Sequence, residues 1–98
     1  MYGATLPNIG AEKYFLVVSN NQRNRALRTA LVVRLTTSRK PSLPSIVALG
    51  HGERFVGWVV CDDIMELYED EVSRDLGALS GPMMTSVSRG LKAALDLP

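Results

Sequence analysis

Two apolar segments in the first half of the chain, Phe15–Val18 and Leu31–Leu35, show the pattern of buried strands. Both are rich in Leu and Val and are bounded by Ser, Asn or Thr, which is typical of strands inside a sheet. The segment between them, residues 21–28, is polar and contains neither Gly nor Pro. Because it follows an Asn pair, a type that often caps helices, we predict about two helical turns between the two strands.

Gly and Pro divide the rest of the chain into further short segments. We expect additional strands at residues 1–6, 45–49, 55–61 and 62–68. Pro41 and Pro44 each remove a backbone donor and predict a loop over Ser38–Ser45, while residues 7–10 and 50–53 have turn compositions. Short strands separated by turns predict a mainly β (α+β) fold, with a small, strongly bent sheet or barrel in which residues 1–6 form part of an edge strand.

Two helices are expected near the end of the chain. Residues 69–76 begin with acidic side chains and precede Gly77, which predicts a short helix. The terminal helix follows Ser80, a capping residue type, and has Pro82 in its first turn. Its apolar stripe consists of Met84, Val87, Leu91 and Leu95. This stripe is long for a small domain to cover alone, so we expect it to form an interface.

Length and composition indicate one domain, residues 1–98, with an ordinary balance of 46% hydrophobic and 21% charged residues. Cys61 is the only cysteine, which excludes an internal disulfide and points to a reducing compartment. No apolar run approaches the roughly 18 residues of a spanning helix, and the first residues lack a signal-peptide pattern. We therefore expect a cytoplasmic protein that does not contact a membrane.

Charge is distributed unevenly along the chain, although the net charge is only +1. Residues 1–40 contain one acid, Glu12, and seven cations: Lys13, Arg23, Arg25, Arg28, Arg34, Arg39 and Lys40. Residues 61–75 show the reverse, with seven acids and Arg74 alone. This polarity favours an anionic ligand on one face, unless the two segments pair with each other or are simply solvated.

The second predicted strand ends in a cluster of hydroxyls and cations: Thr36, Thr37, Ser38, Arg39 and Lys40. Such groups side by side suit a phosphate-rich partner, and the alternative is an ordinary strand that leads into a polar loop. With one His and one Cys the chain has no His/Cys metal cluster, and residues 50–52 lack the features of a phosphate-binding loop. We therefore expect no metal and no cofactor.

Four motifs in order carry a resemblance to a known family. They are LVVSNN (residues 16–21), LVVRLTTS (31–38), VVCDDI (59–64) and LGALSGPMMTSVSRGLKAALDL (76–97). In this arrangement the chain resembles the MazF/PemK family of toxin endoribonucleases over almost its whole length. The resemblance implies an SH3-like barrel with short helices and a C-terminal helix, usually assembled as a homodimer and neutralised by a cognate antitoxin.

The resemblance also implies an activity, which is metal-independent and sequence-selective cleavage of single-stranded RNA. Its products would be a 2′,3′-cyclic phosphate and a 5′-hydroxyl. Two alternatives remain open at this stage. A CcdB-like toxin shares the fold but inhibits DNA gyrase without cleaving nucleic acid, and a catalytically weakened relative would only bind RNA or antitoxin.

Three residues fall on family positions that carry chemistry. The family Arg aligns with Lys13, the family Thr with Thr36, and an Asp that some relatives use with Asp62. Lys13 is a departure, because Lys is a compact point charge whereas Arg holds phosphate with a rigid fork. The alternatives are a solvated charge for Lys13, a common strand residue for Thr36, and a loop-tethering carboxylate for Asp62.

Six polar residues are candidates for holding RNA, since such side chains read unpaired bases or bind phosphates. They are Asn20, Asn21, Thr37, Ser38, Arg39 and Lys40. The alternative role for the two Asn residues is helix capping, and the alternative for the others is solvation.

Overall fold

The computed structural model describes residues 1–5 and 12–98. Its strands are β1 (Tyr2–Thr5), β2 (Glu12–Val17), β3 (Thr29–Thr36), β4 (Ile46–Ala48), β5 (Trp58–Tyr68) and β6 (Val72–Asp75). The helices are α1 (Asn21–Leu27), α2 (Gly81–Leu95) and a single 3-10 turn, η1 (Glu69–Glu71). The turn predicted at residues 7–10 lies outside the described residues.

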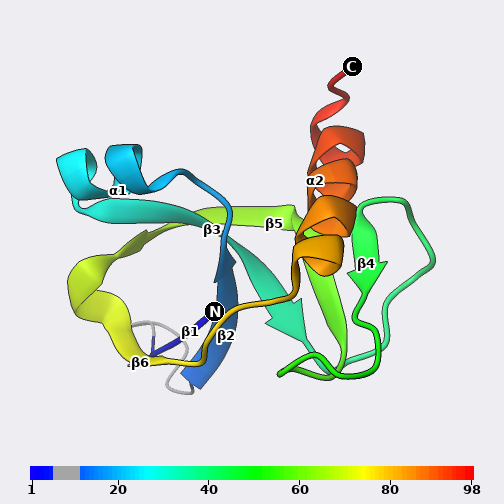
Figure 1. The fold of residues 1–98 in the computed structure, drawn as a ribbon, viewed down its shortest axis with the longest axis horizontal. Coiled ribbons are helices and arrows are strands. Elements are labelled where there is room, and N and C mark those ends of the chain that lie inside the picture. Colours follow the sequence, from blue (N-terminus) through cyan, green and yellow to red (C-terminus); the bar gives the residue numbers. More distant parts are fainter. Residues whose placement is uncertain (6–11) are drawn as a thin grey trace.

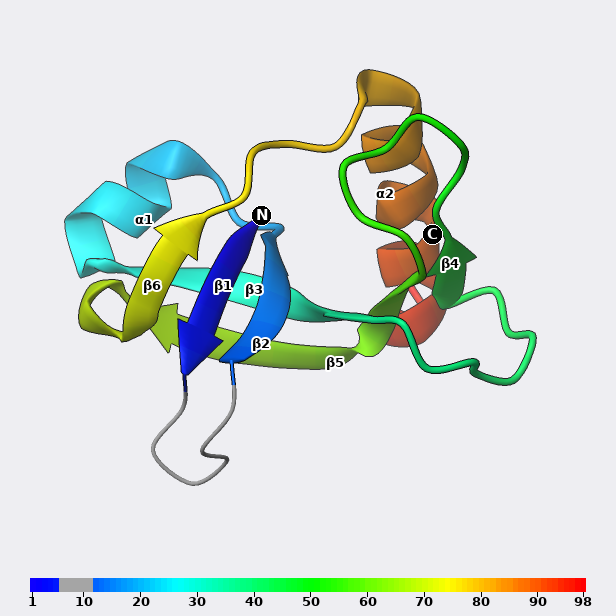
Figure 2. The ribbon, with the colours of Figure 1, turned by 90° about the horizontal axis from the view of Figure 1, so that it is seen from below.

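The strands form one antiparallel sheet in the order β4-β5-β3-β2-β1-β6. The sheet is strongly twisted, and β6, β1 and β2 lie side by side while β3 and β5 run across them (Figure 2). Within the described residues, β4 and β6 are its two edges and do not pair with each other. The predicted α+β fold is confirmed, but the barrel is not closed.

The predicted centre of the chain, a strand, a short helix and a strand, is confirmed as β2, α1 and β3. The side chain of Asn20 accepts a hydrogen bond from the Arg23 backbone N–H and caps α1. The terminal helix α2 is confirmed as well, with Ser80 as its N-cap. Its N-terminus therefore has the start signals that the sequence indicates.

The helix predicted over residues 69–76 is wrong. Only η1 is helical there, and the chain continues as β6, which pairs with β1. Val72 packs against a buried cluster that includes Ala4 and Phe15. Long-range pairing and burial therefore outweigh the local helix signal. Because β6 covers β1, β1 is not an edge strand as predicted.

Helix α2 packs on one face of the sheet, over β5 and β4 (Figure 1). Alternate residues of β2, β3 and β5 point to this face and form its core with Leu79 and Val87: Leu16, Val33, Leu35, Val59 and Cys61. Gly90 lets the helix approach, since a Cβ there would lie 2.8 Å from the Cys61 sulfur. Close helix–sheet contact thus seals this core.

The predicted interface stripe on α2 is mostly covered by the chain itself. Val87 is only 1% exposed and belongs to the core, and Met84 and Leu91 pack partly against it. Leu95 is different, because 52% of its surface remains exposed. The premise of a wholly uncovered stripe is therefore wrong, because the three-four spacing served intramolecular packing.

A second buried cluster lies on the other face of the sheet, inside its curve. It is formed by Ala4, Phe15, Val32 and Leu67. Neither α1 nor α2, the helices in the described part of the chain, is long and apolar enough to cross a membrane.

Candidate active site

The pairing of β2 with β3 brings Lys13 and Thr36 together. The ladder places Tyr14 opposite Leu35 and Phe15 opposite Arg34. One more step of the same antiparallel register sets Lys13 opposite Thr36. Directly opposed residues point to the same face, with Cβ atoms about 5 Å apart. The two residues that the resemblance singles out therefore share one face, on neighbouring strands.

Thr36 is held rigidly at the end of β3. It is 7% exposed, and its hydroxyl oxygen accepts a hydrogen bond from the Ser38 backbone N–H at 3.1 Å. Since a hydroxyl has one proton to donate besides its acceptor sites, that proton remains available. Thr36 also pairs with Trp58 on β5, and this pairing fixes its backbone.

Gly57 lies directly against the backbone of Thr36. Its φ is +137°, and a Cβ built there would lie 2.1 Å from the Thr36 carbonyl oxygen. Only glycine tolerates both that conformation and that contact. Gly57 lies within the segment 55–61 that the sequence predicts as a strand, and a glycine there indicates a bulge or a close backbone approach, which this contact confirms.

The ammonium of Lys13 is not neutralised by its neighbours in the described part of the chain. The ion pairs there join Arg23 to Glu66 and Arg74 to Glu12. Glu12 precedes Lys13 but points to the opposite face. Hydrogen bonds from Arg74 and Ser73 to its carboxylate lower the pKa of Glu12. Lys13 thus takes part in no ion pair among the described residues and is available to a ligand.

Arg34 is a residue that the sequence analysis counted only as charge. Its side chain points to the same face of the sheet as that of Thr36, which lies two residues later in β3. Its Nε atom is buried and has no hydrogen-bond partner, the single such side-chain atom in residues 1–5 and 12–98. An unsatisfied buried donor of this kind costs about 1–3 kcal/mol, and more when charged.

The four residues after Thr36 continue from this site as an exposed segment: Thr37, Ser38, Arg39 and Lys40. The structure therefore brings these predicted RNA-binding residues next to Thr36, because they follow it directly in the chain. Arg39 and Lys40 extend the positive charge of Lys13 and Arg34 away from the sheet.

Asp62 lies in an irregular part of β5. Pairing to β3 shifts there from Ile64 to Val60, so Asp62 has no partner in the ladder. Its carboxylate accepts a hydrogen bond from the Ser45 hydroxyl at 2.6 Å, which tethers the loop before β4. Burial, together with the Asp62 charge, raises the pKa of the adjacent Cys61 thiol to about 11. This geometry favours the tethering role for Asp62.

Asn20 and Asn21 lie at the other end of β2. Six residues of nearly extended chain, 14–19, separate Asn20 from Lys13, a distance of roughly 20 Å. The Asn20 side-chain oxygen accepts from the Arg23 N–H at 2.8 Å. The structure therefore separates these two candidates from Lys13 and Thr36 within one chain, and it gives Asn20 the capping role.

Ser19 and Asn24 organise that far end. The Ser19 hydroxyl donates to the Asn24 side-chain oxygen at 2.6 Å and accepts from the Leu31 N–H at 2.8 Å. The Asn24 amide donates to the Ser19 carbonyl at 3.2 Å. These hydrogen bonds connect α1 to β3, and no local sequence pattern predicts them.

With this geometry in place, the chain can be compared with known proteins. A family model described as the PemK-like, MazF-like toxin of type II toxin–antitoxin systems matches residues 2–95. The chain belongs to this toxin family. The toxin is 40% identical over 86 residues to endoribonuclease MazF1 of Mycobacterium bovis and to endoribonuclease MazF4 of Mycobacterium tuberculosis. The matched part covers 88% of this chain and 81% of each relative.

Solved structures agree with this assignment. The toxin is similar to an endoribonuclease in complex with its cognate antitoxin from a mycobacterial species, with a TM-score of 0.90 and 37% identity. That match covers 99% of this chain and 91% of the other. It also shares its fold with the M. tuberculosis toxin MazF-mt6, with a TM-score of 0.82, 18% identity, and coverage of 99% and 96%.

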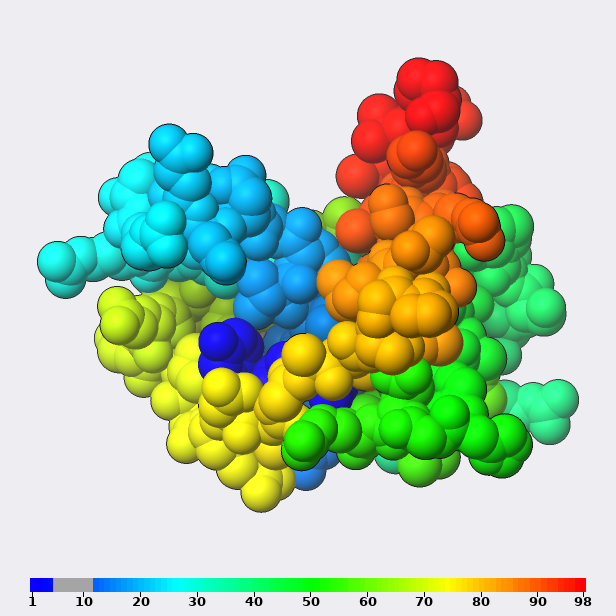
Figure 3. Space-filling view, viewed as in Figure 1, coloured from blue at the N-terminus to red at the C-terminus, as the bar shows by residue number. Residues whose placement is uncertain are grey.

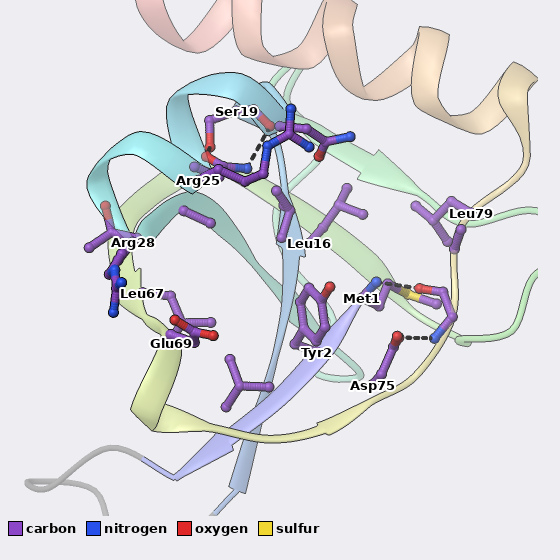
Figure 4. A pocket seen from close by; sticks show the side chains of 18 of the residues that line it. Met1, Tyr2, Leu16, Ser19, Arg25, Arg28, Leu67, Glu69, Asp75 and Leu79 are labelled. Atoms are coloured by element: carbon purple, nitrogen blue, oxygen red, sulfur yellow. Dashed lines mark hydrogen bonds between the residues drawn. The ribbon is translucent and has the colours of Figure 1, made fainter.

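A hollow in the described part of the toxin lies away from Lys13 and Thr36, neither of which lines it. It is a cavity of about 1250 Å³ between α1 and the segment 69–79, with the N-terminal residues at its floor (Figure 3). Asn21 lines it together with Arg25 and Arg28. Figure 4 shows Arg25 and Arg28 on one wall, Asp75 on the other, and Tyr2 and Leu16 between them. Its charges are thus mixed, unlike those around Lys13.

The basic residues of segment 1–40 and the acidic residues of segment 61–75 mostly do not pair with each other in the described part of the fold. Only Arg23–Glu66 pairs a cation of residues 1–40 with an acid of residues 61–75 in the described part of the chain. Within that part, no group of three or more His, Cys, Asp or Glu side chains is placed to hold a metal ion. The described residues of the Lys13–Thr36 site and the segment that follows it contribute cations and hydroxyls: Lys13, Arg34, Thr36, Thr37, Ser38, Arg39 and Lys40.

Proposed function

We propose that this toxin is an endoribonuclease that cleaves single-stranded RNA at the Lys13–Thr36 site. The observation that carries this proposal is the β2–β3 ladder, which pairs Tyr14 with Leu35 and, one step further in the same register, sets Lys13 on the same face as the Thr36 hydroxyl. Neither ion pair of the described residues involves Lys13. The relatives named endoribonucleases support it. They do not favour the gyrase-inhibiting alternative.

The proposed reaction uses the RNA's own 2′-hydroxyl as the nucleophile, because it already lies beside the phosphate. The 2′-oxygen attacks phosphorus and loses its proton to a basic group or water, the bond from phosphorus to the 5′-oxygen breaks, and that oxygen takes up a proton. The products are a 2′,3′-cyclic phosphate and a 5′-hydroxyl. Negative charge grows on the phosphate oxygens during this step.

Each residue then has a defined role. The Thr36 hydroxyl donates a hydrogen bond to a phosphate oxygen, since the Ser38 N–H already orients it from behind. The Lys13 ammonium stabilises the developing charge, and as a titratable group it is also suited to protonate the leaving 5′-oxygen. Neither role requires a metal or a cofactor.

Substrate RNA would continue along the exposed residues that follow Thr36. Thr37, Ser38, Arg39 and Lys40 are suited to bind phosphates and unpaired bases. An antitoxin would compete for this basic surface through an acidic, partly apolar segment. The antitoxin-bound state of a relative that is 37% identical supports this part of the proposal.

We also propose that the toxin acts as a homodimer. Val87 cannot contribute, because it is buried in the chain, but Leu95 and Leu97 are 52% and 55% exposed at the end of α2. Light scattering at micromolar concentration should give the mass of two chains. A single-chain mass would contradict the dimer.

The decisive experiment is to incubate the purified toxin with a long RNA in EDTA and map the ends. Discrete cuts with cyclic phosphate ends support the proposal. A substrate with a single 2′-O-methyl nucleotide at the mapped site should then resist cleavage, and normal cleavage would contradict the mechanism. Intact RNA together with gyrase inhibition would instead identify a CcdB-like toxin, and neither effect would identify a weakened relative.

A further inference from the structure

Arg34 occupies a defined position beside the proposed cleavage site. It lies opposite Phe15 on β2 and opposite Val60 on β5. Because Thr36 is two residues further on and opposite Lys13, Arg34 is a diagonal neighbour of Lys13 across the β2–β3 ladder. Diagonal neighbours are about 7–8 Å apart and within reach of long side chains.

Within residues 1–5 and 12–98, neither a hydrogen bond nor an ion pair is found for the Arg34 side chain. Its Nε is buried without a hydrogen-bond acceptor, and neither ion pair of the described residues involves it. The guanidinium–aromatic contact in that part of the molecule belongs to Arg74 and Tyr14. Asp62, which follows Val60 closely in the chain, is bound by the Ser45 hydroxyl.

A guanidinium in such a place needs an explanation, because nearly all buried polar groups have partners. A purely structural arginine would be expected to fix a carboxylate, a carbonyl or an aromatic ring. Here the neighbours across both ladders, Phe15 and Val60, are apolar. Arg34 does share one face of the sheet with two groups that are suited to bind a phosphate, Lys13 and Thr36.

We propose that Arg34 is the second phosphate-binding cation of this site and contacts the scissile phosphate of the RNA together with Lys13. This inference rests on the proposed endoribonuclease function and adds a catalytic residue to it. The guanidinium fork binds two phosphate oxygens at once, which a Lys cannot do. Since Arg stays protonated in proteins, Arg34 stabilises charge and leaves proton transfer to other groups.

The test compares Arg34→Met and Arg34→Lys with Arg89→Met, a matched change on the exposed surface of α2. Single-turnover cleavage is measured with saturating toxin, and melting temperature is measured for each variant. We expect Arg34→Met to lower the saturated rate at least ~100-fold, the scale of one transition-state donor. Arg34→Lys should retain part of the rate because it keeps the charge but loses the fork. Arg89→Met should behave like the wild type.

Melting temperature separates this role from a structural one. If Arg34 serves the substrate, Arg34→Met removes a buried Nε–H that has no acceptor among the described residues, so the melting temperature should stay unchanged or rise. A rate loss that accompanies a lower melting temperature, and that disappears when the assay is cooled below unfolding, would overturn the inference. So would a wild-type rate in the folded Arg34→Met toxin.

Binding of an uncleavable RNA, with a 2′-O-methyl nucleotide at the site, gives a second readout. Loss of one phosphate contact should reduce the slope of log affinity against log salt by roughly 0.7 for a single strand. An unchanged slope with an unchanged rate overturns the Arg34 inference and leaves the endoribonuclease intact. If the wild type binds but does not cleave RNA, the nuclease proposal fails, and a reduced slope still supports a phosphate contact. If the wild type does neither, both fail.

Discussion

The two ends of the β2–β3 pair contain similar residue types but use them differently. At the α1 end, Ser19, Asn20 and Asn24 satisfy one another and the nearby backbone through short hydrogen bonds. At the opposite end, Lys13 has no ion pair and Arg34 has a buried Nε without an acceptor, within the described residues. Polar residues thus build the structure at one end and remain available to a ligand at the other.

This difference shows that residue type alone does not separate binding residues from structural ones. The Asn pair of the motif LVVSNN suggests RNA contact as strongly as the Thr-Thr-Ser of LVVRLTTS. What separates Asn20 from them is the hydrogen bond that its side-chain oxygen already accepts from the Arg23 N–H, which occupies an acceptor in the folded chain. We call the end with Ser19, Asn20 and Asn24 the filled end and the end with Lys13, Arg34 and Thr36 the open end. A change at the filled end should therefore act on stability, and a change at the open end should act on catalysis.

The largest effect on activity is expected at the open end. We predict that Lys13→Ala and Thr36→Val each reduce RNA cleavage at least ~100-fold, the usual loss for one transition-state donor. Thr36→Val keeps the shape of the buried side chain and removes the hydroxyl. The measurement is the single-turnover rate at saturating toxin, at a temperature where both variants are folded.

Matched controls lie on α2, where Lys92→Ala and Thr85→Val remove the same groups from an exposed helix face. Both should cleave at the wild-type rate. Lys13→Arg should retain or raise activity, because it keeps the cation and adds a fork. Full activity in folded Thr36→Val or Lys13→Ala would remove this site assignment.

A second change should move the open end as a whole. Gly57→Ala places a Cβ 2.1 Å from the Thr36 carbonyl at a φ of +137°, so we expect a loss of roughly 2 kcal/mol in stability from strain and overpacking. Displacement of Thr36 should also slow cleavage. Urea unfolding and the cleavage rate measure the two effects.

Gly52→Ala is the control for backbone strain. Gly52 also has a positive φ, +87°, but a Cβ there would meet no atom within 4 Å. It should lose only about 1 kcal/mol, the cost of the left-handed conformation, and cleave normally. Equal losses in the two variants would show that contact with Thr36 has no part in the effect.

The sequence predicted the central strands because their apolar runs are long enough to outweigh any competing signal. It also predicted α2, since capping, proline placement and helical periodicity agree there. It failed at residues 69–76, where four residues of β6 carry little periodicity and the pairing with β1 comes from 70 residues away. It also failed to show that the edge strands β4 and β6 do not pair with each other within the described residues. Closure of the barrel depends on the curvature of the sheet, which the sequence does not reveal.

The residues of the candidate site also fall into those that the sequence could predict and those that it could not. Lys13 and Thr36 could be found because a family motif marks their positions, and Thr37 to Lys40 because they follow directly. Arg34 could not, since its alternation with Thr36 has meaning only once the β2–β3 register is known. The role of Ser19 was hidden for a related reason, because its partner Leu31 lies beyond α1 in the chain.

At the filled end we predict a loss of stability with little change in catalysis. Ser19→Ala leaves the Leu31 N–H without its acceptor and removes one of the two hydrogen bonds to the Asn24 oxygen, which should cost about 1–3 kcal/mol. Gln22→Ala, on the exposed side of α1, should have almost no effect. Urea unfolding measures both, and cleavage by folded Ser19→Ala should stay within a few-fold of wild type. A catalytic loss as large as that of Thr36→Val would mean that the two ends act on RNA together.

The smallest effect is expected at Glu12, the neighbour of Lys13 on the opposite face. Its carboxylate receives hydrogen bonds from Arg74 at 2.7 Å and from Ser73 at 2.7 Å, and these bonds hold the pKa of Glu12 below its usual value near 4.5. The unfolded chain therefore binds a proton more readily than the folded chain. This contribution to stability is present above pH 4.5 and is lost as the pH falls through the lowered pKa. Glu12→Gln should reduce the melting temperature slightly at pH 7 and flatten its decline in acid, while cleavage at pH 7 stays unchanged because the carboxylate faces away from Lys13. If Glu12→Gln instead changed the cleavage rate at neutral pH, the charge of Lys13 would depend on its neighbour, and the separation of the two faces would be incorrect.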